Sequence, residues 1–209
     1  MFRLIDIIFP PRADEIVMRD TSDDDFLSLV SPRLVPATRP GTVALLPFYH
    51  PSVRSAIHEA KYHGNERARR LLALALAEYL CDSDDVGHRK SYIVPVPLGK
   101  ARRRERGFNQ AEEVARRAIH NLGKESTQRF KLDTSLLVRT RETVSQVSLP
   151  RLEREENMRG AFGAAHPADP TSTYLIIDDV LTTGATLQAA IDALKSAGAT
   201  NIIPLALAH

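Results

Sequence analysis

Hydrophobic positions along this chain alternate between short continuous runs and helical spacing, which is typical of a protein built from strands and helices. Residues 92–96, 174–177 and 201–208 are apolar runs of strand length, as expected for strands buried on both faces of a parallel sheet. An amphipathic helix is predicted between the last two runs, ending near Gly198, because apolar residues recur there with helical spacing: Leu187, Ala190, Ile191, Leu194 and Ala197. The pattern predicts an α/β fold with a central, mainly parallel sheet flanked by helices.

Other segments extend this fold. The spacing of apolar residues predicts helices over 71–80 and 108–118, and residues 135–139 predict a further strand. At 209 residues and 43% hydrophobic content, the chain can bury one sizeable core. We divide it into an N-terminal arm or subdomain, residues 1–52, and a main domain, residues 53–209. No apolar helix face is long enough to span a bilayer. The apolar start, residues 1–12, lacks a cleavage site and is expected to be a docking arm.

The segment YLIIDDVLTTGAT, residues 174–186, carries the strongest chemical signal. Asp178 and Asp179 stand where the predicted strand ends, and ligands of such folds bind at the carboxyl ends of strands. The turn that follows lies at a helix N-terminus, which attracts anions, and it offers hydroxyl groups and a flexible glycine: Leu181, Thr182, Thr183, Gly184, Ala185 and Thr186. Two adjacent carboxylates suit a ribose diol or a hydrated Mg²⁺. A surface turn with threonine caps and solvated aspartates is the alternative.

Two familiar nucleotide motifs are absent from this segment. No lysine follows Gly184, as a P-loop would require, and no GxGxxG fingerprint of a dinucleotide site occurs. The combination therefore favours a ligand that carries a phosphate and a diol on one molecule.

A second segment predicts an anion site. The strand at 92–96 is followed by Pro97, Leu98 and a basic loop, and residues 100–106 hold five basic residues and one acidic residue, against +2 for the whole chain. The sequence RGFNQ then opens a helix with Asn109 as its cap and Glu112 in a capping-box position. A solvated loop, or one that meets nucleic-acid phosphates, remains the alternative. Lys61, predicted to lie in a loop, is either a further anion ligand or a surface charge.

Cysteine and histidine content excludes several kinds of site. Cys81 is the one cysteine, which excludes an internal disulfide and a multi-cysteine metal site, and we expect it to be buried at a helix end. Among the seven histidines, His58 and His63 are five residues apart and should diverge on a helix, so no ligand pair is expected.

The apolar strand, acidic pair and TTG turn at residues 174–186 resemble the signature of the type I phosphoribosyltransferases. That resemblance implies a site for 5-phosphoribosyl 1-pyrophosphate. Asp178 and Asp179 would be the catalytic residues, contacting the ribose hydroxyls or Mg²⁺, directly or through water, and the turn at 181–186 would bind the 5-phosphate. A pyrophosphate site is then required nearby, and we assign it to Lys61, Pro97, Leu98, Arg102, Arg106 and Asn109.

Four ordered segments resemble the ComF family of phosphoribosyltransferase-like proteins, members of which are associated with competence for DNA uptake. They are VRSAIHEAKYHGN at 53–65, PVPL with the basic run and RGFNQ, SQVSLPRLEREENMRGAF at 145–162, and the acidic segment. Many such proteins begin with a four-cysteine zinc module, and residues 1–40 contain no cysteine. Residues 139–159 resemble the flexible loop of the wider family, or form an ordinary surface connection, with a helix expected around 150–158.

These features predict a phosphoribosyltransferase that uses Mg²⁺ and transfers the phosphoribosyl group to an unknown nitrogen acceptor, with release of pyrophosphate. The alternative is a non-catalytic protein that binds a phosphoribosyl ligand and acts in DNA uptake or regulation. The hood over the acceptor is expected within residues 1–90 or 139–159. We further expect a cytoplasmic protein that forms a homodimer, without a membrane partner; nucleic acid is an additional partner under the alternative.

Overall fold

A six-stranded sheet forms the centre of the computed structural model, which describes residues 11–36, 41–82, 90–123, 128–142 and 156–209. Its strands follow the order β1-β2-β8-β7-β3-β4, with these bounds: β1 (Arg33–Val35), β2 (Thr42–Leu46), β3 (Ser91–Pro95), β4 (Phe130–Leu132), β7 (Thr173–Val180) and β8 (Asn201–Ala208). Every neighbouring pair is parallel except β1 with β2. A separate antiparallel pair joins β5 (Leu137–Arg139) to β6 (Phe162–Ala164).

The central strand β7 explains why its sequence is continuously apolar. Leu175 and Ile177 pack into a core on one face of the sheet, and Tyr174 and Ile176 pack into a core on the other. Because side chains alternate across a strand, a strand that is covered on both faces has to be apolar at successive positions. The expected parallel sheet with helices on its faces is confirmed.

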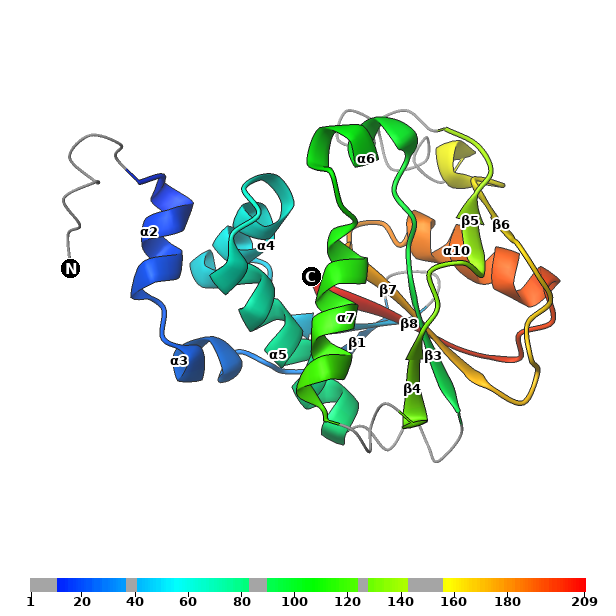
Figure 1. Ribbon diagram of the computed structural model, residues 1–209, viewed down its shortest axis with the longest axis horizontal. Helices are drawn as coiled ribbons and strands as arrows, with labels where there is room; N and C mark the ends of the chain where they lie inside the picture. Colours follow the sequence, from blue (N-terminus) through cyan, green and yellow to red (C-terminus); the bar gives the residue numbers. More distant parts are fainter. Residues whose placement is uncertain (1–10, 37–40, 83–89, 124–127, 143–155) are drawn as a thin grey trace.

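Helices cover both faces of the sheet, as Figure 1 shows. One face is covered by α4 (Pro51–Tyr62), α5 (Glu66–Asp82) and α7 (Gln110–Asn121), and the other by α10 (Ala185–Ser196) together with β5 and β6. Leu71, Leu72 and Leu76 of α5 are completely buried in the first core. None of the helices in the described part of the chain combines the length and apolar character needed to cross a membrane.

Two N-terminal helices attach to the first helical layer. They are α2 (Ala13–Asp20), which packs on α4, and α3 (Asp23–Leu27), which packs on α5. Arg12 donates from its guanidinium to both carboxylate oxygens of Glu59, at 3.0 and 2.9 Å, and Arg67 donates to the carbonyl of Met18. The proposed boundary at residue 52 stays a prediction, although β1 and β2, which precede it, already belong to the sheet.

Several local expectations differ from the structure. The basic run expected as a loop is a short helix, α6 (Lys100–Arg106), because its residues are mostly strong helix formers and Gly107, at φ 77°, ends it. Lys61 lies in the last turn of α4 rather than in a loop, since Pro51 starts a helix that continues to Tyr62. Cys81 is exposed in the last turn of α5.

Element boundaries follow the expectations closely elsewhere. Gly198, at φ 102°, stands directly after the cap of α10 and ends that helix as expected. The strand expected at 135–139 begins at Leu137, because the Asp133 carboxylate accepts hydrogen bonds from the backbone of Ser135 and Leu136 and holds a turn there. The apolar start at residues 1–10 and most of the expected helix at 150–158 lie outside the described residues.

The two leucines Leu76 and Leu34 give a test of the core. Leu76 is completely buried in α5, whereas Leu34 in β1 is 64% exposed. We expect Leu76→Ala to lower the free energy of unfolding by about 2–5 kcal/mol, because it leaves a cavity under the sheet. Leu34→Ala should change it by less than about 0.5 kcal/mol. Urea unfolding measures both, and an equal loss for the two variants would contradict the assignment of the core.

Candidate active site

A pocket of about 530 Å³ opens at the carboxyl ends of β3 and β7. It is bounded by the end of α4, the segment that leads into α6, the start of α7, the end of β7 and the turn before α10. Ten of its residues carry polar or charged side chains: Lys61, Arg102, Arg106, Asn109, Gln110, Arg139, Asp178, Asp179, Thr182 and Thr186. The pocket thus brings four distant parts of the sequence to one place.

The acidic pair sits at the end of β7, and one member is paired with a lysine. Asp179 Oδ2 lies 2.9 Å from Lys61 Nζ, and both side chains are mostly buried, at 19% and 17% exposure. The side chain of Asp178 contacts the neighbouring backbone: its Oδ1 accepts a hydrogen bond of 2.8 Å from the N–H of Asp179. Lys61 therefore neutralises one carboxylate, and the second remains close to it.

The pKa of Asp178 reflects this crowding. Removal of water from its carboxyl group and the negative charge of Asp179 raise the pKa of Asp178 from 3.8 to about 7, against the weaker opposing effects of Lys61 and Arg102. A cation or hydrogen-bond donor that enters the pocket would stabilise the charged form of this carboxyl group. The pair is consequently suited to oxygen coordination of Mg²⁺ or to a ribose diol.

The turn after β7 presents a helix N-terminus to the pocket. Gly184 caps α10 with φ 80°, a conformation that residues with side chains rarely adopt. Thr182 and Thr186 line the pocket, and Leu181 anchors the turn through a hydrogen bond of 2.9 Å from its N–H to the carbonyl of Ala208. The N–H groups at the start of this twelve-residue helix and the threonine hydroxyls are hydrogen-bond donors of the kind that suits an anion.

The segment before α6 is held in place by Asn109. This residue is 6% exposed; its Nδ2 donates to the carbonyl of Val96 at 2.9 Å and its Oδ1 accepts from the N–H of Ala111 at 3.1 Å. The expected cap of α7 is confirmed, but Glu112 pairs with Arg116 at 2.8 Å and not with the cap. Asn109 thus fixes the end of β3 and the start of α7 together.

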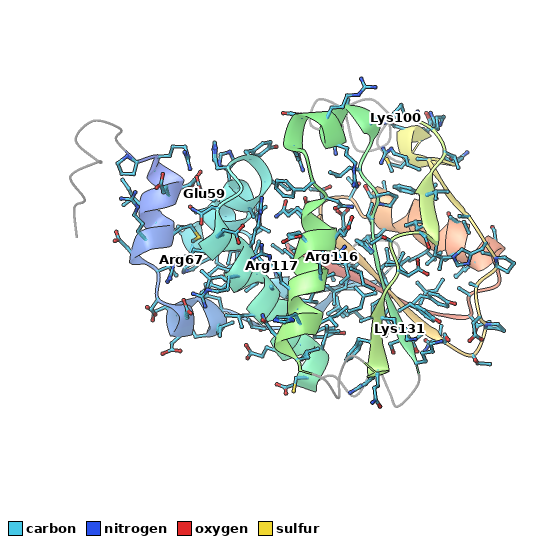
Figure 2. All side chains as sticks on the ribbon, in the orientation of Figure 1. Glu59, Arg67, Lys100, Arg116, Arg117 and Lys131 are labelled. Carbon is cyan, nitrogen blue, oxygen red and sulfur yellow. The ribbon has the colours of Figure 1, made fainter. Side chains whose placement is uncertain are left out.

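A second set of contacts reaches this segment from the β5 side. Arg139 Nη1 donates to the carbonyl of Pro97 at 3.3 Å, and the Glu142 carboxylate accepts a hydrogen bond of 2.9 Å from the backbone N–H of Lys100. Burial lowers the pKa of Arg139, with Glu142 and Asp178 opposing that effect. Figure 2 labels Lys100 at this end of α6, above the sheet.

Most of the residues expected from sequence meet in this pocket. They are Lys61, Pro97, Leu98, Arg102, Arg106, Asn109, Asp178, Asp179, Thr182 and Thr186. Leu181, Thr183, Gly184 and Ala185 form the turn behind the lining rather than the lining itself. The roles of all these residues in binding stay predictions. Of the expected flexible loop at 139–159, residues 143–155 lie outside the described residues.

Sequence reasoning missed several lining residues, among them Phe48, Gln110 and Arg139. Phe48 comes two residues after the apolar run of β2. That run is the sequence signal for a strand, and a strand there places Phe48 at the same edge of the sheet as the acidic pair. Gln110 is 1% exposed, and neither of its amide atoms has a hydrogen-bond partner among the described residues. A buried amide of this kind is a candidate partner for a ligand or a bound water.

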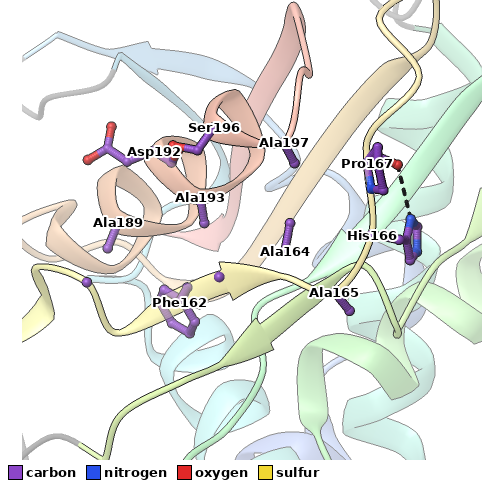
Figure 3. A pocket seen from close by; sticks show the side chains of 12 residues that line it. Phe162, Ala164, Ala165, His166, Pro167, Ala189, Asp192, Ala193, Ser196 and Ala197 are labelled. Atoms are coloured by element: carbon purple, nitrogen blue, oxygen red, sulfur yellow. Dashed lines mark hydrogen bonds between the residues drawn. The ribbon is translucent and has the colours of Figure 1, made fainter.

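A second hollow, of about 640 Å³, lies between β6 and α10 (Figure 3). Phe162 and Ala164 of β6 face Ala189 and Ala193 of α10 there. Its lining is mostly small and apolar and lacks the acidic pair, the arginines and the threonine turn. The smaller pocket is therefore the candidate active site.

Comparison with models of protein families identifies one family for this chain. Residues 72–208 match the phosphoribosyl transferase domain family. No curated protein matches the chain.

Solved structures that match this chain include three from bacteria. A phosphoribosyltransferase from Corynebacterium diphtheriae is 18% identical, with a TM-score of 0.39, covering 88% of this chain and 78% of its own. An orotate phosphoribosyltransferase from Mycobacterium tuberculosis, in complex with Fe(III) dicitrate, is 15% identical, with a TM-score of 0.39 and coverage of 88% and 81%. A hypoxanthine phosphoribosyltransferase from Staphylococcus aureus is 15% identical, with a TM-score of 0.38; the match covers 66% of this chain and 61% of that protein.

The raised pKa of Asp178 predicts a dependence of stability on pH. Because the folded-state pKa of about 7 exceeds the unfolded value of 3.8, the folded state holds this proton more tightly. The associated stability is fully present below about pH 4 and is lost as the pH rises through 7. Relative to Asp178→Asn, the wild-type protein should lose up to about 4 kcal/mol between pH 4 and pH 8.

Urea unfolding of both proteins at several pH values, without divalent cations, measures this difference. Asp192→Asn, at an exposed position on α10, is the matched control and should follow the wild-type protein. A difference between wild type and Asp178→Asn that stays constant from pH 4 to pH 8 would show that Asp178 titrates normally.

Proposed function

This chain belongs to the phosphoribosyl transferase domain family, and we propose that its pocket binds 5-phosphoribosyl 1-pyrophosphate with Mg²⁺ and transfers the phosphoribosyl group to a nitrogen acceptor. One observation carries the proposal: a single pocket contains an acidic pair, a helix N-terminus with threonines, and three arginines, two of them on α6. These groups match the ribose, the 5-phosphate and the pyrophosphate of one ligand.

The 5-phosphate is assigned to the turn at residues 181–186. A phosphate monoester there accepts hydrogen bonds from the first N–H groups of α10 and from the hydroxyls of Thr182 and Thr186. Gly184 has no side chain, so the ligand can approach the backbone closely. Leu181 and Ala185 of this turn are buried, and the N–H of Leu181 donates to the carbonyl of Ala208.

The ribose is assigned to Asp178 and Asp179. Their carboxylates accept hydrogen bonds from the 2- and 3-hydroxyls, and they also provide the hard oxygen ligands that Mg²⁺ prefers, directly or through water. Mg²⁺, when bound, supplies positive charge that stabilises the departing pyrophosphate. Asp179 is paired with Lys61, so ligand binding exchanges that ion pair for new contacts and leaves the ammonium group available to the pyrophosphate.

The leaving group is assigned to the segment at 97–109. In the reaction, the bond between the anomeric carbon and the pyrophosphate oxygen breaks, its electron pair leaves with the pyrophosphate, and the lone pair of the acceptor nitrogen forms the new bond. Arg102 and Arg106, one turn apart on α6, face the pocket and hold the growing negative charge, while Asn109 fixes the neighbouring backbone of Pro97 and Leu98. No covalent intermediate with the protein is needed.

The finer identity of the protein belongs to the same proposal. The order of the four sequence segments supports a place in the ComF family, and we assign the protein to the cytoplasm as a homodimer. Light scattering at two protein concentrations tests the dimer.

The acceptor is a nitrogen compound of undefined structure, and Phe48 is the aromatic residue at the pocket against which a planar acceptor would stack.

Removal of the acidic pair tests the ligand. We expect Asp178→Asn combined with Asp179→Asn to weaken binding of 5-phosphoribosyl 1-pyrophosphate in the presence of Mg²⁺ at least about tenfold, as measured by calorimetry. Asp192→Asn is the control, because it changes an exposed carboxylate on α10 without touching the pocket. Absence of binding to the wild-type protein at millimolar ligand would exclude the proposal.

Two neighbouring arginines test the position of the pyrophosphate. Arg102 lines the pocket, whereas Arg103 points outward with its side chain 60% exposed. We expect Arg102→Gln to weaken binding of 5-phosphoribosyl 1-pyrophosphate about tenfold while changing affinity for ribose 5-phosphate, which lacks the pyrophosphate, much less. Arg103→Gln should leave both affinities unchanged. Equal weakening of the two ligands by Arg102→Gln would place the pyrophosphate elsewhere.

Release of pyrophosphate separates an enzyme from a binding protein. Incubation of the wild-type protein with the ligand, Mg²⁺ and a panel of nucleobases and amines should release pyrophosphate above the rate of the double aspartate variant. Binding without release for every acceptor would favour the non-catalytic alternative, a ligand-responsive protein in DNA uptake or regulation.

A further inference from the structure

The last turn of α4 brings two histidines and a buried glutamate together, away from the acidic pair. Ligand atoms of His58, Glu59 and His63 all lie within 4.8 Å of one another. The expectation that the two histidines diverge is wrong because α4 ends at Tyr62, and His63, at φ −120°, already follows a non-helical course. Their rings meet edge to face, with centroids 5.5 Å apart.

A carboxylate on α2 orients one of these histidines. Asp14 Oδ2 lies 2.9 Å from Nδ1 of His58, and Asp14 Oδ1 accepts a hydrogen bond of 2.7 Å from the hydroxyl of Ser55. A proton on Nδ1, shared with Asp14, leaves the lone pair of His58 on Nε2. Metal-binding histidines characteristically have such a carboxylate partner, which fixes the ring and increases its basicity.

Glu59 retains capacity for a cation despite its protein contacts. Its side chain is completely buried; Oε2 accepts hydrogen bonds from Arg12 and Asn65, and Oε1 accepts one from Arg12. A carboxylate has about four lone-pair sites, so Oε1 keeps one. The connected charges are three carboxylates, Asp14, Glu15 and Glu59, against two guanidinium groups, Arg12 and Arg19, which leaves one net negative charge while the imidazoles are neutral.

We propose that His58, Glu59 and His63 bind a divalent transition-metal ion of the Zn²⁺ class, with Asp14 as the residue that orients His58. Two imidazoles and one carboxylate form a set that suits Zn²⁺ or Co²⁺ and not Mg²⁺, which prefers oxygen alone. The site is partly open, because both histidines are exposed, and water completes the coordination. It is distinct from the magnesium site proposed at Asp178 and Asp179.

Such an ion would strengthen the contact between α2 and α4, because Asp14 of α2 holds its ligand His58. Figure 2 shows Glu59 on α4 beside α2. The same turn of α4 carries Lys61, which pairs with Asp179, and Tyr62, whose ring lies 5.0 Å from the guanidinium carbon of Arg106. A metal at this turn therefore fixes the backbone from which two pocket contacts arise.

Direct metal binding tests the site. The full chain, stripped with a chelator, should bind one Zn²⁺, and Co²⁺ should give the visible absorption of a site with nitrogen ligands. His58→Gln and His63→Gln should each weaken Zn²⁺ binding at least about tenfold, and Asp14→Asn about 10–100-fold through loss of the orienting contact. His120→Gln, at an exposed position on α7, is the matched control and should bind as the wild type does.

Two further measurements make the result decisive. Circular dichroism and unfolding without metal show whether each variant is folded; His58 is 47% exposed, so its replacement should be tolerated. The double aspartate variant should still bind Zn²⁺, and His58→Gln should still bind 5-phosphoribosyl 1-pyrophosphate with Mg²⁺, so that either proposal can fail alone. No Zn²⁺ bound by folded wild-type protein, or equal binding by the histidine variants and His120→Gln, would overturn the site.

Discussion

The ion pair between Lys61 and Asp179 joins the two halves of the pocket. A strand that ends in two adjacent carboxylates needs a nearby cation, because like charges in a partly dry site repel each other strongly. Lys61 supplies that cation from α4, a helix that packs in the layer outside the sheet. The position of α4, and with it the position of α2 and Tyr62, is thereby linked to the charge at the end of β7. Any ligand that changes this charge acts on both sides of the pocket.

Much of the site could be predicted because its motifs are short and continuous in the sequence. The acidic pair, the TTG turn and the RGFNQ cap each carry their signal within a few residues, so their placement at strand ends and helix starts followed from the sequence. The loop predicted for residues 100–106 is wrong because charge alone does not distinguish a loop from a helix, and most residues of α6 favour a helix. The predictions from sequence include neither β2, which at five residues is as long as β3, nor Phe48, which follows it.

Contacts between distant segments were beyond the reach of sequence reasoning. Arg139 reaches the carbonyl of Pro97, and the Glu142 carboxylate reaches the N–H of Lys100, across more than 40 positions of the chain. The histidine cluster depends on the residue at which α4 ends, since one more helical turn would have separated the rings. Helix ends are the least certain feature of a sequence pattern, and here one such end decides whether three potential metal ligands meet.

The position of β8 between β2 and β7 has a consequence for how the protein folds. Val43 of β2 pairs with Leu205 of β8, so this part of the sheet unites segments that are far apart along the chain. Forming such a pair closes a long loop, and the chain entropy is lost before the contacts that compensate for it have formed. This slows folding. Strands β3 and β7, with α7 packed on them, can assemble through segments that lie nearer to one another along the chain, with the acidic pair already at the end of β7. The wall of the pocket that carries Phe48 would then form late, and an incompletely folded chain would present half a ligand site together with an unpaired strand edge.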